Sequence, residues 1–238
     1  MPPLVDESVL SDGGIKVDQS GATLTITLAR PDSRNSQTPA TWRALSAVAT
    51  SLPSDVRIVV LRGEGKSFSA GLDKRMFAEG VDGELPLSGM ANLSDADFDA
   101  AIAGFQHAFT CWRDLDAIVI AAVQGHAIGA GFQLALGADL IVVANDVQFS
   151  MKETQLGLVP DLGGTQPLVA AVGYPTALEM CASGRWIGAQ EAVSSGIAVA
   201  NVEVGELDEE VARLSEGFLS GLPEAVSETK HLLSGALA

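Results

Sequence analysis

Two glycine-rich turns are the stretches of this sequence whose residue types could most readily do chemistry. The first is "GKSFSAGLDKRMF" (65–77) and the second is "GHAIGAGFQL" (125–134), and each joins an expected strand to an expected helix. Glycine lets a backbone approach a ligand closely, and the first N–H groups of a helix have no partner inside it. Two such turns facing each other would supply converging N–H donors for a negative oxygen, which is an oxyanion hole. Either turn taken alone is more commonly an ordinary tight connection.

The elements that must position these turns alternate between strands and helices. Strands are expected at 22–30, 56–63, 117–125 and 139–145, and helices at 38–52, near 97–114 and from about 129 to 137. Thr38 and Pro39 are residue types typical of a helix start. Alternation of this kind predicts an α/β fold with a largely parallel sheet and helices outside it.

The composition excludes several classes of partner. The 238 residues carry 14 basic and 30 acidic side chains, for a net charge of −16. Nucleic-acid binding depends on Lys and Arg neutralising phosphates, so no nucleic-acid partner is expected. There is no apolar run of about 20 residues, so no membrane span is expected. The first residues, "MPPLVDESVL", lack the basic and apolar regions of a signal peptide.

The cysteines indicate a reducing compartment, and the histidines do not indicate a metal site. Cys111 and Cys181 are far apart in apolar settings, which is typical of free thiols in a reducing cytoplasm. A cytoplasmic location is therefore expected. His126 is expected to be structural, and the three histidines form no set with metal-ligand spacing.

Four stretches in fixed order carry a family resemblance. They are "ARPDSRN" (29–35), "GKSFSAGLDKRM" (65–76), "VQGHAIGAGFQLALGADLIVVA" (123–144) and "LGLVPDLGGTQPL" (156–168). Together they resemble the crotonase family, the enoyl-CoA hydratases and isomerases, from about residue 20 onward. The resemblance implies an α/β fold built as a spiral of ββα units with C-terminal helices. It also implies assembly as a trimer or hexamer.

The same resemblance implies the ligand and the domain plan. Family members bind acyl-CoA thioesters and stabilise an enolate at the thioester oxygen. Coenzyme A is then part of the substrate, and no other cofactor is expected. We expect a crotonase-like core domain over 1–195 and a C-terminal helical segment over 196–238, shorter than is usual for the family.

Backbone and cationic roles follow residue by residue. The resemblance assigns the two oxyanion N–H groups to Leu72, in "SAGLD", and Ala130, in "IGAGF". It assigns the coenzyme A phosphates to Arg34, Lys74 and Arg75, although a solvated basic surface is an equally good explanation of each cation.

Three polar residues are assigned to catalysis. In the hydratases two glutamates activate a water and deliver a proton. Gln133 stands at the first of these positions, where an amide cannot accept a proton at neutral pH, and Glu153, in "SMKETQLG", stands at the second. Asp161, in "LVPDLGG", stands where some relatives, dienoyl-CoA isomerases and 4-chlorobenzoyl-CoA dehalogenases among them, place a working aspartate. The alternative for Asp161 is a cap on a helix that begins near Gly163.

Three functions are left open. The preferred one is an isomerase that shuttles a proton with Glu153, in which Gln133 is a neutral spectator that Ala could replace at little cost. The second is an enoyl-CoA hydratase in which Gln133 orients a water. The third is a catalytically weak acyl-CoA-binding protein. The loop 78–95, with Leu85, Leu87 and Met90, is expected either to line the acyl pocket or to form a lid without substrate contact.

Overall fold

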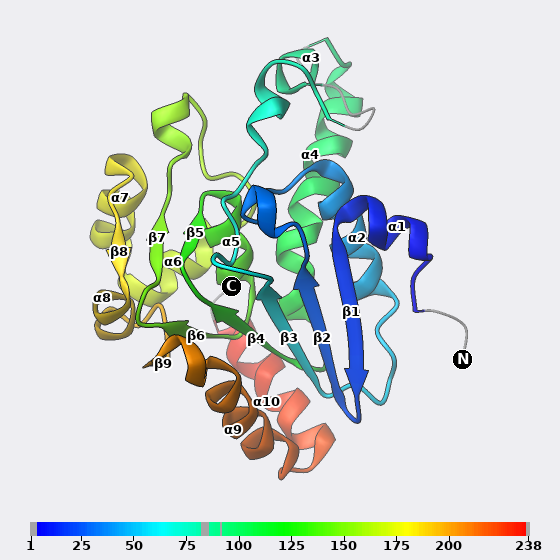
Figure 1. Ribbon diagram of the computed structural model, residues 1–238, viewed down its shortest axis with the longest axis vertical. Coiled ribbons are helices and arrows are strands. Elements are labelled where there is room, and N and C mark those ends of the chain that lie inside the picture. The colour runs from blue at the N-terminus through cyan, green and yellow to red at the C-terminus, as the bar shows by residue number, and fades with distance from the viewer. Residues whose placement is uncertain (1–3, 82–85, 91, 237–238) are drawn as a thin grey trace.

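A mixed arrangement of helices and strands is seen in the computed structural model, which describes residues 4–81, 86–90 and 92–236 (Figure 1). The α-helices are α1 (Glu7–Gly13), α2 (Pro39–Thr50), α3 (Leu87–Met90), α4 (Asp95–Thr110), α5 (Ala130–Gly137), α6 (Thr165–Val172), α7 (Tyr174–Ser183), α8 (Ala189–Ser194), α9 (Leu207–Leu219) and α10 (Pro223–Gly235). The 3₁₀ helices are η1 (Pro31–Ser33), η2 (Lys74–Phe77), η3 (Cys111–Asp114), η4 (Glu153–Leu156) and η5 (Val204–Glu206).

The strands form two sheets. They are β1 (Ile15–Ser20), β2 (Thr23–Leu28), β3 (Ile58–Gly63), β4 (Ile118–Val123), β5 (His126–Ile128), β6 (Leu140–Ala144), β7 (Gln148–Ser150), β8 (Ile187–Gly188) and β9 (Ala200–Val202). The larger sheet has the order β1-β2-β3-β4-β6-β9, and every pair in it is parallel except β1 with β2. The smaller sheet has the order β5-β7-β8. Each of β4 and β6 leads directly into a short strand of the smaller sheet, so the chain repeats a strand–strand–helix plan.

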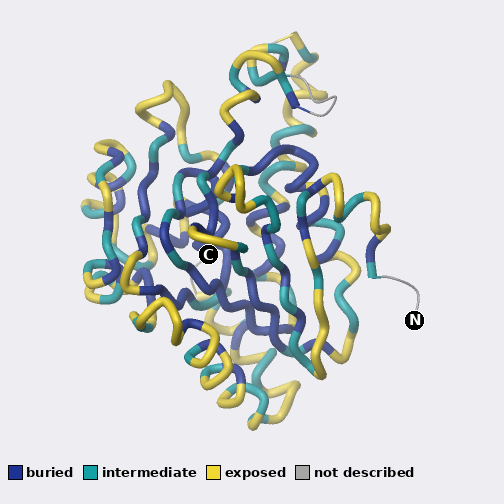
Figure 2. The backbone as a smooth tube through the Cα atoms, viewed as in Figure 1, coloured by how far each residue is buried: buried dark blue, intermediate teal, exposed yellow. Residues whose placement is uncertain are grey.

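The central strands are buried on both faces, which explains their continuous apolar sequences. Side chains that alternate along β3 and β4 enter two separate cores. Val59 and Val119 face the larger core, which α2, α4 and α5 cover. Ile58 and Ile118 face the smaller core, which α9 covers. Figure 2 shows this buried centre, with exposed backbone concentrated on the outer helices and loops.

The predicted fold class is confirmed, and so are most of the elements expected from the sequence. The expected helix start is seen in α2, where the Thr38 hydroxyl accepts the N–H of Thr41 and Pro39 occupies the first turn. The strands that periodicity did not indicate are β1, β5, β7, β8 and β9. Among them β1 is largely exposed at the sheet edge, and the others have only two or three residues. An alternating pattern needs more residues than these to be recognised.

The C-terminal segment is bound to the core by the sheet and by a buried ion pair. The boundary predicted at 195/196 falls just before β9, which pairs with β6, so the main sheet extends into the predicted C-terminal segment. The ammonium group of Lys230, on α10, is buried. It donates to the carbonyl oxygens of Trp112 at 2.9 Å and Ala117 at 2.8 Å, and lies 2.9 Å from Asp139 Oδ2.

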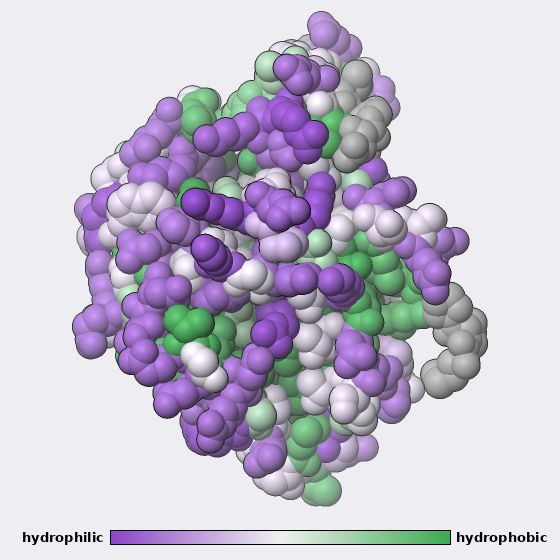
Figure 3. Space-filling model, in the orientation of Figure 1, coloured by the Kyte–Doolittle hydropathy of each residue, from purple (hydrophilic) through white to green (hydrophobic). Residues whose placement is uncertain are grey.

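The surface is consistent with the composition. The face shown in Figure 3 is largely hydrophilic, with apolar residues in scattered patches. None of the helices in the described ranges is both long and apolar enough to cross a bilayer. Cys111 and Cys181 are free thiols, and burial raises the pKa of the Cys111 thiol to about 12.

Removal of Lys230 should show how strongly α10 is held. Lys230→Met leaves the buried Asp139 carboxylate and two carbonyl groups without their cation, so unfolding free energy should fall by about 3–5 kcal/mol. In the double variant Lys230→Met/Asp139→Asn the unpaired charge is gone, and part of that loss should be recovered. Urea unfolding of the three proteins measures both values. Equal stability of the single and double variants would show that the unpaired charge of Asp139 does not destabilise the protein.

Candidate active site

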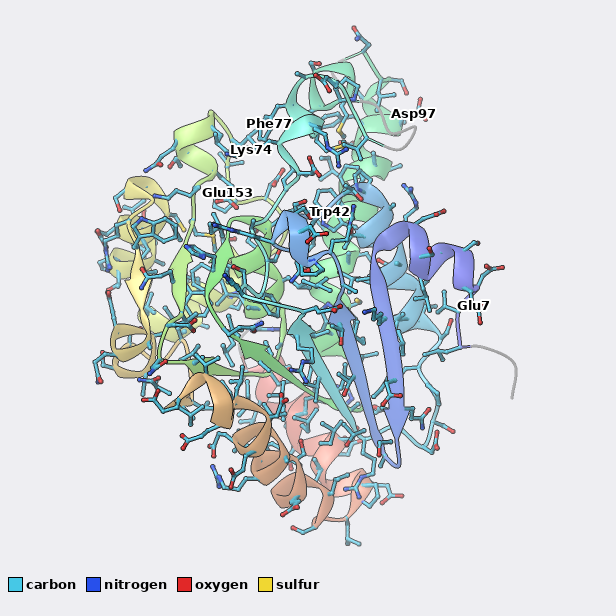
Figure 4. The ribbon with its side chains drawn as sticks, in the orientation of Figure 1. Glu7, Trp42, Lys74, Phe77, Asp97 and Glu153 are labelled. Carbon is cyan, nitrogen blue, oxygen red and sulfur yellow. The ribbon has the colours of Figure 1, made fainter. Side chains whose placement is uncertain are left out.

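A cavity of about 720 Å³ lies beyond the carboxyl ends of the parallel strands, where ligands of open α/β sheets commonly bind. Four of the residues labelled in Figure 4 line it: Trp42 comes from α2, Lys74 and Phe77 from η2, and Glu153 from η4. The lining also includes residues of both glycine-rich turns. The elements that build the cavity are therefore far apart in the sequence.

The two turns predicted to face each other do lie in contact. A Cβ at Gly71 would lie 2.3 Å from the carbonyl oxygen of Ile128 and 3.4 Å from the nitrogen of Ala130. A Cβ at Gly131 would lie 2.5 Å from the carbonyl oxygen of Ser69. Only glycine permits such an approach, and Gly71 also has a positive φ of 81°. A backbone bridge between Ser69 and Ala127 joins the same two segments.

The N–H groups of Leu72 and Ala130 are available to a ligand. On either side of Leu72 the backbone is paired with Gln37, which donates to Gly71 and accepts from Asp73. Ala130 is the first residue of α5, where a helix N–H has no internal acceptor. Both residues line the cavity, and neither N–H donates to any group within the described ranges. The two donors that the sequence singled out are thus brought to one wall.

Glu153 is a buried carboxylate on the same cavity. Only 8% of the residue is exposed, and its Oε1 accepts a hydrogen bond of 2.7 Å from Gln133 Nε2. Its Oε2 has no partner in the part of the chain that the structure describes. Burial raises the pKa of Glu153, and the negative charge of Asp161 raises it further, whereas the hydrogen bond from Gln133 opposes this rise.

The structure corrects the view of Gln133 as a spectator. The side chain is 1% exposed, and its Oε1 accepts the backbone N–H groups of Leu162 at 3.0 Å and Gly164 at 3.2 Å. Its Nε2 donates to Glu153, so three hydrogen bonds in all fix the orientation of the amide. Truncation to Ala would leave all three partners unsatisfied, and it should not be the small change expected from the sequence.

Asp161 lies at the cavity but does not cap the following helix. Helix α6 begins at Thr165 with Gly164 as its N-cap and has no side-chain cap, so the capping alternative is wrong. Asp161 is one of the residues that line the cavity, and partial burial raises the pKa of its carboxyl group. Its backbone carbonyl accepts a hydrogen bond of 2.7 Å from Gln106 Nε2 of α4.

Of the three cations predicted to bind phosphate, two line the cavity. These are Arg34 and Lys74. Arg75 instead pairs with Asp73, Nη2 to Oδ2 at 2.8 Å, and this contact lowers the pKa of Asp73 to about 2. A further cation, Lys152, also lines the cavity, with its ammonium 4.7 Å from the centre of the Trp186 ring. No local sequence pattern pointed to Lys152, because nothing in the sequence relates it to Trp186.

Aromatic rings form the apolar wall of the cavity in place of the expected loop residues. The rings are Trp42, Phe77, Phe105 and Trp186, and Trp42 lies edge-to-face with Phe105 at 4.8 Å between centroids. Periodicity placed Trp42 and Phe105 only on helices, without showing which face meets a ligand. Met90 is buried, and neither it nor Leu87 lines the cavity. Leu85 lies outside the described residues.

His126 has the structural surroundings expected for it. Its ring lies 5.9 Å from that of Trp186 in an edge-to-face arrangement, and Nδ1 is 3.5 Å from Ser67 Oγ. Across the residues described here, no group of three or more His, Cys, Asp or Glu side chains is arranged to hold a metal ion.

A family model described as enoyl-CoA hydratase/isomerase matches residues 18–237. The chain therefore belongs to this family, the crotonases, and is a crotonase-family enzyme. Carnitinyl-CoA dehydratase from Escherichia coli K12 is 36% identical over 222 residues, which are 92% of this chain and 79% of the relative. The sequence-based family assignment is confirmed.

Solved structures agree with this assignment. A candidate enoyl-CoA hydratase from Thermobifida fusca in complex with acetoacetyl-CoA is 44% identical, with a TM-score of 0.91, and the match covers 96% of this chain and 89% of that one. An enoyl-CoA hydratase subunit I from Geobacillus kaustophilus is 31% identical, with a TM-score of 0.80, and the match covers 94% and 82%. The confirmed fold is thus shared by a protein crystallised with a CoA ester and by an enoyl-CoA hydratase subunit.

Substitutions at Gln133 separate its two roles. Gln133→Met keeps most of the volume but loses the amide, so unfolding free energy should fall by about 2–4 kcal/mol. Gln133→Glu keeps the acceptor for Leu162 and Gly164 but removes the donor to Glu153 and adds a like charge. The pKa of Glu153 should therefore rise, which ¹³C NMR titration of its carboxyl carbon would measure. An unchanged pKa in Gln133→Glu would contradict the electrostatic role.

Proposed function

We propose that Glu153 is the proton-transfer group of an enzyme that moves the double bond of a 3-enoyl-CoA thioester to the 2,3 position. The observation that carries this proposal is the unpartnered Oε2 of Glu153 on the same cavity as the two free N–H groups. Enolate chemistry needs a base and hydrogen-bond donors that stabilise the negative charge on the thioester oxygen.

The reaction follows from these groups. Glu153 removes a proton from C2, and the electrons pass into the thioester as a dienolate. The N–H groups of Leu72 and Ala130 donate to the negative oxygen, and each such donor typically contributes about 10²- to 10³-fold in rate. The protonated Glu153 then returns a proton to C4, so one carboxyl group serves as base and then acid. Its raised pKa suits both roles, because the carboxylic acid is less costly to form.

The contact between Gln133 and Glu153 favours isomerisation over hydration. The two side chains touch directly at 2.7 Å, so no water lies between those atoms. Gln133 cannot take a proton at neutral pH, so a second acid–base group is missing from the position that hydratases use. Isomerisation needs only one such group.

Hydration, or its reverse, dehydration, is the second candidate. It is favoured by the relatives, since a dehydratase and hydratases share 31–44% identity with the chain. In this case Oε2 of Glu153 would act on the water or the leaving hydroxyl, with Gln133 fixing the other carboxylate oxygen.

Arg34 and Lys74 would hold the phosphates of coenzyme A, which is part of the substrate, and no further cofactor would be needed. We also propose a homo-oligomer in the cytoplasm, in line with the family.

A panel of thioesters tests the reaction. Wild-type protein should convert a 3-enoyl-CoA to the conjugated 2-enoyl-CoA, followed at the absorbance of the conjugated thioester. Glu153→Gln should reduce this rate by at least about 10³-fold while leaving CoA-ester affinity largely intact. Robust hydration without isomerisation would support the second candidate. Tight binding without either reaction, and without exchange of the C2 proton into deuterated water, would indicate a binding protein.

The cations should act on affinity and not on chemistry. Arg34→Ala and Lys74→Ala should each weaken CoA-ester binding by about 3- to 10-fold at low salt and reduce its salt dependence, with little change in kcat. Arg75→Ala should change affinity less, because Arg75 is engaged with Asp73 and does not line the cavity. Calorimetric titration at two salt concentrations compares the three. Wild-type affinity in both Arg34→Ala and Lys74→Ala would remove these residues from the phosphate site.

A further inference from the structure

Gln37 is a buried amide next to the turn that presents the Leu72 N–H, and the proposed proton transfer does not use it. The residue is 0% exposed and does not line the cavity. Its Oε1 accepts a hydrogen bond of 2.9 Å from Trp42 Nε1, and its Nε2 donates to Ser69 Oγ at 3.0 Å. Burial of an amide costs free energy unless it is hydrogen-bonded, so the contribution of Gln37 lies in the groups that its two bonds orient.

The direction of these hydrogen bonds is set by the chemistry of the groups. An indole N–H can only donate, so it faces Oε1 of Gln37 and leaves Nε2 to face Ser69. The Ser69 hydroxyl then accepts from Gln37 and donates its one proton to the carbonyl oxygen of Asn35 at 2.7 Å. Its other lone pair accepts the N–H of Gly71 at 3.2 Å. A chain of hydrogen bonds with one direction therefore leads from the Trp42 ring to the backbone of Gly71.

The peptide between Gly71 and Leu72 is oriented by the same residue. The carbonyl oxygen of Gly71 accepts the backbone N–H of Gln37 at 2.7 Å. The C=O and N–H of a planar trans peptide point in opposite directions, so this bond directs the Leu72 N–H away from Gln37. Leu72 lines the cavity, and rotation of this peptide would withdraw its N–H from a bound thioester.

Ser69 also joins the first glycine-rich turn to the second. Its backbone N–H donates to the carbonyl oxygen of His126 at 3.0 Å, and its carbonyl oxygen accepts the N–H of Ile128 at 3.0 Å. Ile128 lies two residues before Ala130, which presents the other free N–H. The hydroxyl that Gln37 orients thus belongs to the residue that connects the two turns.

We propose that Gln37 is a positioning residue for the oxyanion donors. Through Ser69 and Gly71 it holds the Leu72 N–H in the direction that a thioester oxygen needs, and the Trp42 N–H sets the orientation of the Gln37 amide. This inference rests on the proposed stabilisation of an enolate by these N–H groups, and it holds for either candidate reaction. Trp42 then has two roles, because its ring forms part of the apolar wall and its N–H supports the chemical step.

The carbonyl stretch of bound [1-¹³C]butanoyl-CoA tests the proposal, because N–H donors to a carbonyl oxygen lower its stretching frequency. Infrared difference spectra should show a lower frequency on the wild-type protein than for the free ester in buffer. Gln37→Leu should move the frequency back toward that of the free ester and slow exchange of the C2 protons into deuterated water by about 10- to 100-fold. Calorimetric titration should show that CoA-ester affinity changes by less than about threefold.

Trp42→Phe is a milder variant that keeps a ring and removes only the N–H that orients Gln37. It should shift the carbonyl stretch and the exchange rate in the same direction by smaller amounts. In the double variant Gln37→Leu/Trp42→Phe, the second substitution should add little to the first, because the Trp42 N–H acts through Gln37. If Gln37→Leu does not fold, as urea unfolding would show, the stretch in Trp42→Phe decides the question.

Trp112→Phe is the matched control. Trp112 is buried outside the cavity, and its Nε1 donates to the carbonyl oxygen of Ala108 at 2.8 Å. The variant loses the same kind of hydrogen bond, so its unfolding free energy should fall while the carbonyl stretch and the exchange rate stay at wild-type values.

Three results would overturn the inference. They are a wild-type stretch equal to that of the free ester, a wild-type stretch and exchange rate in folded Gln37→Leu or Trp42→Phe, and an equal shift in Trp112→Phe. A stretch that depends on Gln37 without isomerisation or hydration of any ester would support the inference and count against the proposed function alone.

Discussion

The site depends on the absence of a side chain at two glycines. At Gly71 and Gly131 the backbones of the two turns approach so closely that any Cβ would meet a carbonyl oxygen of the other turn. That approach sets the free N–H groups of Leu72 and Ala130 on one wall of the cavity and ties β3 and β4 together beyond their ends. A constraint on backbone volume thus determines where charge can be stabilised, and the side chains are arranged around it.

The second organising feature is the way a buried negative charge is tolerated. Glu153 is buried in a protein that already carries an excess of 16 negative charges. Gln133 supplies a donor without adding a positive charge, so the carboxylate is oriented and stays available for protonation. An Arg or Lys at the same position would stabilise the anion more strongly, but it would make the base weaker. The amide therefore orients the carboxylate while lowering its pKa less than a cation would.

The sequence indicated the elements of the core and the positions of the site more fully than it indicated the contacts between them. Long apolar strands and the Thr38–Pro39 helix start could be recognised because their signals are local. The glycines at 71 and 131 pointed to the turns because few other residues allow such backbone conformations and approaches. The family resemblance placed Gln133 and Glu153 in one site, but the hydrogen bonds of Gln133 could not be predicted, because Glu153 and Gly164 are 20 and 31 residues further along the chain. The same limit applied to Lys152 and Trp186, whose contact depends on the short strand β8 beside β7.

One feature of α5 has a bearing on how the family can diversify. All eight of its residues are buried, so the helix that presents the Ala130 N–H is enclosed on every side. Leu156, Leu158 and Val159, by contrast, are exposed and also line the cavity. Amides of α5 belong to the part of the molecule that opens least, whereas the 156–159 wall can change with little effect on folding. Under the proposed function, mutations along the 156–159 wall can therefore change the substrate range while the backbone N–H of Ala130 stays in place.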